Sequence, residues 1–193
     1  EMCIRDRGIG CLYLLSLTNA FVICFVAFIA IPMIILYPLM KRFLGIPQLF
    51  LGLTFGLSLP ISFAIVNESI SMDAWLLYLA CVFWIVAYDS YYALCDIDDD
   101  RKLKLNSLPI FFGDDTRKVI VLLFTCFILL IICFAKVNNL QMMSIGVLFL
   151  IYQAYFQNKL SKEGKNLDAF KSNSHVGLVI AVILFLETQS GLY

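Results

Sequence analysis

The chain has 193 residues, of which 62% are hydrophobic and 15% are charged, and its formal net charge is zero. An ordinary soluble domain carries about 45–50% apolar and about 25% charged residues, so this composition excludes that class. The balanced charge suggests no nucleic-acid partner. The apolar runs are continuous rather than alternating, which favours spanning helices over a barrel. The predicted fold class is therefore all-α, a polytopic transmembrane helical bundle.

Six apolar segments follow one another along the chain. They cover about residues 11–36, 46–66, 74–95, 119–137, 141–157 and 175–190. A helix needs about 20 residues to cross a bilayer, so the last two segments need their flanks to do so. The connections fall at about 37–45, 67–73, 96–118, 138–140 and 158–174. With no internal repeat and no linker, residues 11–193 are predicted to form one membrane domain.

Residues 1–10 do not fit this pattern. Arg5 and Arg7 lie on a face that otherwise carries few cations, and the acidic residues beside them do not suit a signal peptide. We interpret residues 1–10 as a leader that is non-native or disordered. We therefore assign no function to them.

The cations predict the orientation of the bundle. Three connections on one face contain eleven of the fourteen Lys and Arg residues, namely Lys41, Arg42, Arg101, Lys102, Lys104, Arg117, Lys118, Lys159, Lys162, Lys165 and Lys171. Short cytoplasmic loops carry the excess of Lys and Arg in membrane proteins. This face is therefore predicted to be cytoplasmic.

An acidic cluster stands where the third apolar segment ends, at Asp96, Asp98, Asp99 and Asp100. If the helix continues past Cys95, Asp96 and Asp100 are four residues apart and share one face. Like charges at the C-terminal end of a helix oppose both each other and the helix dipole. A divalent cation would relieve that repulsion, and Mg²⁺ is commonly held by one or two carboxylates together with substrate phosphates.

A different interpretation of the same cluster stays open. Arg101 and Lys102 follow it directly and could neutralise a solvated acidic loop that has no ligand.

Asp89 lies inside the apolar segment and could face a cavity or cap a neighbouring helix. An ionisable group within a spanning segment is a candidate functional residue.

A second candidate motif ends the first segment. Tyr37 and Lys41 are four residues apart, and Arg42 follows. A lysine ammonium and an arginine guanidinium both suit phosphate oxygens. The alternative is a pair of cations that only sets the membrane orientation. A cationic and an anionic cluster on one face together predict a site for a metal and a diphosphate.

At these motifs the chain resembles a known family. Residues 37–42 (YPLMKR) and 87–100 (AYDSYYALCDIDDD) are similar to bacterial 4-hydroxybenzoate polyprenyltransferases of the UbiA type. The second stretch resembles the second aspartate-rich motif of the family, DxxxD. Ala169-Phe170, Asn173 and Val176-Gly177-Leu178 resemble the start of its last helix. The resemblance covers roughly residues 20–190.

The resemblance implies a nine-helix bundle, of which about six helices are present. It implies an enzyme of the bacterial inner membrane that transfers a polyprenyl group from polyprenyl diphosphate to the ring of 4-hydroxybenzoate, in ubiquinone biosynthesis. Mg²⁺ would be the cofactor and membrane lipid the surroundings, with no obligate protein partner expected.

The resemblance also implies site residues. Asp96 and Asp100, with Asp99 nearby, would bind Mg²⁺ on the diphosphate, and the first two would be catalytic together with Arg42. Substrate contacts would come from Tyr37, Lys41, Arg42, Tyr92 and Lys102. Tyr92 or Tyr88 could shield the allylic cation with the face of its ring.

The chain departs from the family pattern in three places. Lys104 stands where a glycine is usual, and Asn106 stands where a lysine is expected. The first aspartate-rich motif of the family, NDxxDxxxD, does not occur. We therefore expect a chain truncated at its N-terminus and inactive by itself. The alternatives are a family member with another acceptor, or a membrane transporter or structural protein without enzymatic activity.

Overall fold

The computed structural model describes residues 2–190, and the side chains of residues 9–189. Residue 1 and the side chains of residues 2–8, all in the predicted leader, lie outside the described part. Helices account for the regular structure throughout that part, and it contains no strand. The α-helices are α1 (Met2–Ser16), α2 (Ala20–Phe25), α3 (Ile31–Phe43), α4 (Pro47–Gly56), α5 (Ser58–Asn67), α6 (Met72–Cys95), α7 (Ile97–Lys102), α8 (Leu108–Phe112), α9 (Thr116–Val137), α10 (Met143–Lys162), α11 (Asn166–Lys171) and α12 (Ser174–Ser190).

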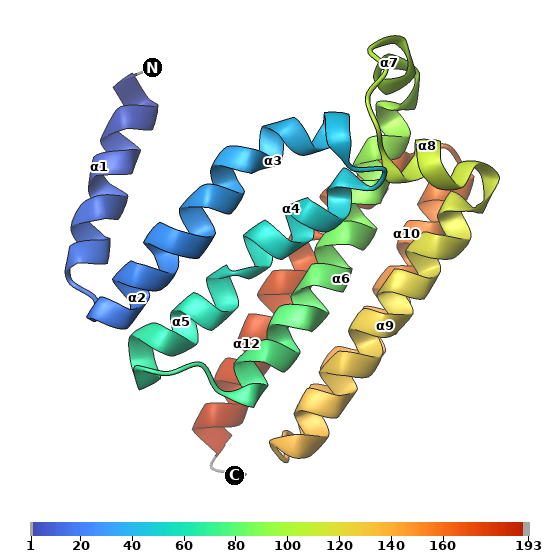
Figure 1. Ribbon diagram of the computed structural model, residues 1–193. Coiled ribbons are helices and arrows are strands. Elements are labelled where there is room, and N and C mark those ends of the chain that lie inside the picture. Colours follow the sequence, from blue (N-terminus) through green and yellow to red (C-terminus); the bar gives the residue numbers. More distant parts are fainter. Residues whose placement is uncertain (1, 191–193) are drawn as a thin grey trace.

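Five helical stretches within the described residues are long and apolar enough to cross a membrane. They are Ala20–Phe43, Pro47–Asn67, Met72–Cys95, Leu108–Val137 and Asn166–Gln189. Long helices run side by side in Figure 1, with the short helices α7 and α8 at one end. The predicted all-α transmembrane bundle is thus confirmed.

The predicted segment 141–157 is a helix, α10, but it is not among these five stretches. Its second half carries Gln153 and Gln157, whose side chains are buried. Both amides donate hydrogen bonds to the Ser172 hydroxyl, at 2.9 and 3.1 Å. The polar residues that make α10 less apolar therefore face protein, where both side-chain N–H groups have an acceptor, while Gln157 Oε1 has no partner among the described residues.

The first predicted segment, 11–36, is wrong at both ends. Helix α1 ends at Ser16, and a new helix begins at Ala20 with Asn19 as its N-cap. The Asn19 side chain accepts a 2.9 Å hydrogen bond from the Val22 N–H and donates one of 3.0 Å to the Ala64 carbonyl. This polar residue ends one helix and fixes the next, which apolar content alone does not reveal.

The first spanning stretch also continues through a short π-helix, η1 (Val26–Ala30), into α3. Whether residues 1–10 are native remains a prediction, although the described α1 includes most of them. In Figure 1, α1 lies at the outer edge of the molecule beside α2 and α3.

Helix α4 lies against α6 through two glycines one turn apart. A Cβ added at Gly52 would lie 3.0 Å from the Val82 carbonyl oxygen and 3.0 Å from Val86 Cγ2. A Cβ at Gly56 would lie 3.0 Å from the Tyr78 ring. Small residues spaced in this way let two helix backbones approach closely within a membrane.

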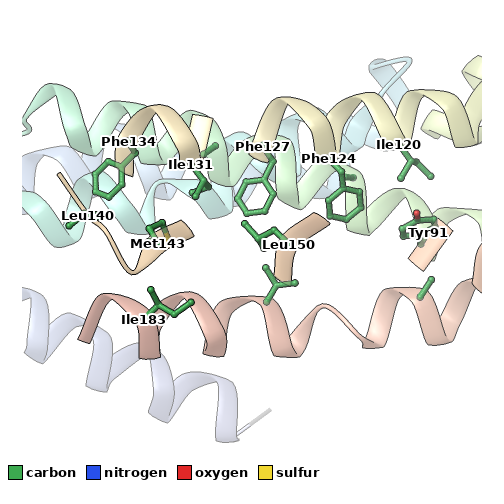
Figure 2. Packing of buried hydrophobic residues seen from close by; sticks show 14 residues of the cluster. Tyr91, Ile120, Phe124, Phe127, Ile131, Phe134, Leu140, Met143, Leu150 and Ile183 are labelled. Atoms are coloured by element: carbon green, nitrogen blue, oxygen red, sulfur yellow. The ribbon is translucent and has the colours of Figure 1, made fainter. Parts of the chain in front are cut away.

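The main hydrophobic core lies between α6, α9, α10 and α12. Figure 2 shows a row of side chains from α9, namely Ile120, Phe124, Phe127, Ile131 and Phe134, facing Met143, Leu150 and Ile183. The row recurs every three or four residues, which is the spacing of one helix face. These contacts hold the C-terminal half of the bundle together and leave α6 with a second face toward α4.

A buried carboxylate at one end of this bundle and an exposed arginine at the other make hydrogen bonds to helix termini. At one end, Glu187 of α12 accepts hydrogen bonds of 2.8 Å from the backbone N–H groups of Gln141 and Met142, which precede α10. At the other end, Arg117 donates to the Ser161 carbonyl at 3.1 Å and to its hydroxyl at 3.2 Å. The Glu187 carboxylate thus lies at the N-terminus of α10, and the Arg117 guanidinium lies at its C-terminus. The helix dipole favours a negative charge at the first position and a positive charge at the second.

Candidate active site

Tyr37, Lys41 and Arg42 lie on the last turns of helix α3. The sequence prediction placed them in a connection at 37–45, but the helix continues to Phe43 with Pro38 inside it. Tyr37 and Lys41 are therefore one helical turn apart and share a face. Tyr37 is half-buried, whereas Arg42 is exposed.

The acidic cluster begins where α6 ends at Cys95. This is the predicted end of the apolar segment 74–95, and the conditional case of a helix that continues past it is not met, because Asp96 has φ −97° and ψ 3° and separates α6 from α7. The Asp96 carbonyl nevertheless accepts hydrogen bonds from the Asp99 and Asp100 N–H groups, at 3.1 and 2.8 Å. This turn keeps the backbones of Asp96 and Asp100 close together in space, while Ile97 begins a separate helix, α7.

Lys41 and Asp100 bring the two motifs together. The Lys41 ammonium lies 3.5 Å from Asp100 Oδ1, and the Asp100 side chain is only 6% exposed. The second oxygen, Oδ2, is buried and has no hydrogen-bond partner among the described residues. A buried carboxylate oxygen without a partner is costly, so it indicates a site that a ligand or cation completes.

Asp99 points away from this pair. Its carboxylate accepts a 2.9 Å contact from Lys102, and the two side chains are 76% and 73% exposed. Asp98 is exposed too, and Asp96 is half-buried. The interpretation of a solvated, locally neutralised loop therefore fits Asp99 and Lys102, but it does not fit Asp100.

Backbone hydrogen bonds fix the end of α3 against the segment that follows α7. The Asn106 N–H donates to the Lys41 carbonyl at 2.9 Å, and the Leu105 N–H donates to the Asp100 carbonyl at 2.9 Å. The buried side chain of Gln48 accepts a 2.9 Å hydrogen bond from the Leu108 N–H. Gln48 was not among the residues predicted for the site; the signal in the sequence is a polar residue at the start of an apolar segment.

Asp89 lies on α6, about two turns before Asp96, and is half-buried. It is within electrostatic reach of Lys41 and Asp96. Within the described residues it makes no hydrogen bond to the end of another helix, so the idea that it is a helix cap is not supported. It instead extends the charged site toward the interior of the bundle.

Aromatic side chains line α6 beside the acidic residues. The Phe170 ring lies 5.2 Å from the Tyr92 ring and 5.8 Å from the Tyr88 ring, measured between centroids. Trp84 lies 5.4 Å from Tyr88, one turn deeper. Tyr92 is 42% exposed, so one part of its ring remains free to meet a substrate.

The carboxylates at this site are chemically suited to binding Mg²⁺. Asp96 and Asp100 offer carboxylate oxygens, which are the ligands that this hard cation prefers. Asp100 Oδ2 is the buried oxygen that lacks a partner. The described side chains include no group of three acidic, His or Cys residues that could hold a metal alone. An ion at this place would take its remaining oxygen ligands from other groups, such as a phosphate or water.

The fold and site define a class: an all-helical integral membrane protein with a paired cation and carboxylate at one end of its bundle. A sequence model of the UbiA prenyltransferase family matches residues 8–182. The chain belongs to this family.

Individual relatives agree with that assignment. The chain is 35% identical over 187 residues to a 4-hydroxybenzoate octaprenyltransferase of Enterobacter sp. (strain 638), covering 93% of the chain and 63% of that protein. It is 37% identical over 150 residues to the octaprenyltransferase of the same name from Escherichia coli O139:H28, covering 75% of the chain and 51% of that protein.

A solved structure supports the fold independently. The structure of a UbiA homologue from Aeropyrum pernix K1, without ligand, superposes with a TM-score of 0.76 and 19% identity, over 90% of the chain and 66% of that protein. The chain thus spans about half to two thirds of the length of the relatives it matches.

Proposed function

We propose that this chain forms part of an enzyme that transfers a polyprenyl group from polyprenyl diphosphate to the ring of 4-hydroxybenzoate. The single observation that carries the proposal is the Lys41–Asp100 pair, with its buried and unpartnered Asp100 Oδ2. The names of the two relatives support the choice of reaction.

In the reaction, the allylic carbon–oxygen bond breaks and its electron pair leaves with the diphosphate. The ring carbon then forms the new carbon–carbon bond and loses its proton. Lys41 and Arg42 would hold the diphosphate oxygens, and Lys102 would add a third cation at the rim. Fixed cations that face a leaving group stabilise the charge that develops on it.

Mg²⁺, when bound, would neutralise the diphosphate further and polarise the bond that breaks. Asp96 and Asp100 would hold it, and Asp99 would reach it only by giving up its contact with Lys102. Tyr92 would lie beside the reacting carbon and shield its positive charge with the ring face.

The site would face the cytoplasm of a bacterial inner membrane. The last turn of α3, which carries Lys41, is hydrogen-bonded to the loop of Asn106, so these two cation-bearing segments lie at the same end of the bundle. The excess of cations at that end supports the cytoplasmic assignment.

The test uses the protein produced from its gene locus in bacterial membranes, supplied with a labelled polyprenyl diphosphate and 4-hydroxybenzoate. We expect transfer that stops when Mg²⁺ is chelated and that falls at least about a hundredfold in Asp96→Asn and Asp100→Asn. Asp98→Asn, an exposed neighbour, is the matched control and should keep its activity. Full turnover by both site variants would refute the assignment.

We also propose that the 193-residue chain is inactive by itself. It lacks the NDxxDxxxD motif, which the family would use for the other half of the diphosphate site. Purified chain with both substrates and Mg²⁺ should give no prenylated product. Measurable product would overturn this part of the proposal and leave the family assignment intact.

A further inference from the structure

A cavity of about 300 Å³ opens beside the aromatic residues of α6. It is lined by Trp84, Tyr88, Phe170, Lys171, Asn173 and Ser174, which come from α6, α11, α12 and the turn between the last two. Three of the six are aromatic and one is a cation. Small-molecule sites commonly combine apolar and aromatic walls with a few polar groups that set orientation.

The walls of this cavity are fixed by a hydrogen-bond network. The Trp84 indole N–H donates to the Asn173 side-chain oxygen at 3.0 Å. The Asn173 amide donates in turn to the Ala169 and Phe170 carbonyls, at 3.2 and 3.1 Å. Asn173 is buried, so it ties α6 to α11 and holds the aromatic walls in place.

Lys171 brings an unneutralised charge to the rim. It is exposed, and its ammonium makes no ion pair with any described side chain. Four other lysines, Lys104, Lys136, Lys159 and Lys162, also make no ion pair with a described side chain, but Lys171 is the lysine that lines this cavity. A free cation above aromatic walls suits a flat ring that carries a carboxylate.

From the charged site, the cavity lies farther along α6, toward the interior of the bundle. Tyr88, Tyr92 and Asp96 follow one another at intervals of four residues along α6 and its end. At 1.5 Å per residue, Tyr88 lies about 12 Å along the helix from Asp96. Phe170 contacts both tyrosines, so the cavity adjoins the path from the carboxylates into the bundle.

We infer that this cavity binds the aromatic carboxylate acceptor, with the ring against Trp84, Tyr88 and Phe170 and the carboxylate at Lys171. The inference rests on the proposed function, because it assigns the acceptor to one side of α6 and the diphosphate to the Lys41–Asp100 side. It makes Lys171 a specificity-determining residue.

The test uses the intrinsic fluorescence of the purified protein in detergent. The chain has two tryptophans, so Trp75→Phe leaves Trp84 as the only reporter. 4-Hydroxybenzoate should quench this fluorescence saturably, with and without geranyl diphosphate and Mg²⁺. Lys171→Gln should raise the Kd for 4-hydroxybenzoate about tenfold, since it removes a charge-assisted contact.

Two controls distinguish a specific effect of the Lys171 charge from a general effect of losing a positive charge. Lys162→Gln loses the same charge at the end of α10, away from the cavity, and should leave the Kd unchanged. Phenol, which lacks the carboxylate, should bind weakly and equally to the parent protein and to Lys171→Gln.

Other outcomes would overturn the inference. If geranyl diphosphate quenches Trp84 and 4-hydroxybenzoate does not, the cavity holds the prenyl donor instead. An equal Kd for 4-hydroxybenzoate in the parent protein and Lys171→Gln would also refute it. If the protein produced from its gene locus transfers the prenyl group but 4-hydroxybenzoate does not quench Trp84, the inference alone fails. If quenching is observed but the protein produced from its gene locus gives no transfer, the proposed function alone fails.

Discussion

The side-chain carbonyl oxygen of Gln48 accepts a 2.9 Å hydrogen bond from the backbone N–H of Leu108, sixty residues later in the chain. Both residues are buried. The bond joins the start of α4, just after the end of α3 that carries Lys41, to the start of α8, which follows the helix α7 that carries Asp100. The distance between the cationic and anionic motifs therefore depends on it.

We expect Gln48→Leu to lower the free energy of unfolding by about 1–3 kcal/mol, because it leaves the buried Leu108 N–H without a partner. Unfolding in detergent micelles measures this. Gln141→Leu, at an exposed position, is the matched control and should stay within about 0.5 kcal/mol of the parent protein. Equal effects of the two substitutions would contradict a role for this hydrogen bond.

The two lysine–aspartate pairs of the site should respond differently to substitution. Lys41→Met leaves the buried Asp100 carboxylate without its ion pair, and we expect a loss of about 1–3 kcal/mol without Mg²⁺. Saturating Mg²⁺ and diphosphate should recover part of that loss, because ligands that bind the folded state stabilise it. A Lys41→Met protein as stable as its parent would contradict the importance of this pair.

Lys102→Met should leave stability at neutral pH unchanged, because the Lys102–Asp99 pair is exposed to solvent and screened. The hydrogen bond to Asp99 raises the pKa of the Lys102 ammonium. A raised pKa in the folded state stabilises the protein below the unfolded pKa, and this effect disappears as pH rises through the folded value. Any difference in stability between Lys102→Met and the parent protein should therefore vanish at strongly alkaline pH. Thermal melts of both proteins at a series of pH values test this. A difference in melting temperature that grows as pH rises would contradict it.

Lys104 occupies a left-handed backbone conformation, with φ 53°. This explains why the family pattern has glycine here, since a glycine adopts positive φ without steric cost. Lys104→Gly should raise the free energy of unfolding by about 1 kcal/mol. Lys104→Ala removes the same charge but keeps a Cβ, so it should bring no gain. Equal stabilisation by both would point to charge rather than to backbone conformation.

Gly52 sets the distance between α4 and α6, one turn after Gln48. Gly52→Ala places a Cβ 3.0 Å from the Val82 carbonyl oxygen, so the helices must move apart. We expect a loss of about 1–3 kcal/mol in detergent unfolding. Gly10→Ala is the control, because its Cβ would meet no atom within 4 Å. A Gly52→Ala protein as stable as Gly10→Ala would show that the helices do not require this close approach.

The sequence by itself determined the class of protein. Continuous apolar runs can satisfy their backbone hydrogen bonds in a membrane only as helices, so composition and segment length predict the bundle. Local spacing also related Tyr37 to Lys41, because four residues make about one turn of any helix. The family motifs added the reaction class, which the residues alone left open.

Only the tertiary structure decided which charges meet. Four aspartates in one cluster look alike in the sequence, yet Asp100 is buried beside Lys41 and Asp99 is exposed beside Lys102. The difference arises from the break at Asp96, from the hydrogen bond between the Asn106 N–H and the distant Lys41 carbonyl, and from the one between the Leu108 N–H and Gln48. Burial and pairing depend on such long-range contacts, and no local pattern along the chain encodes them.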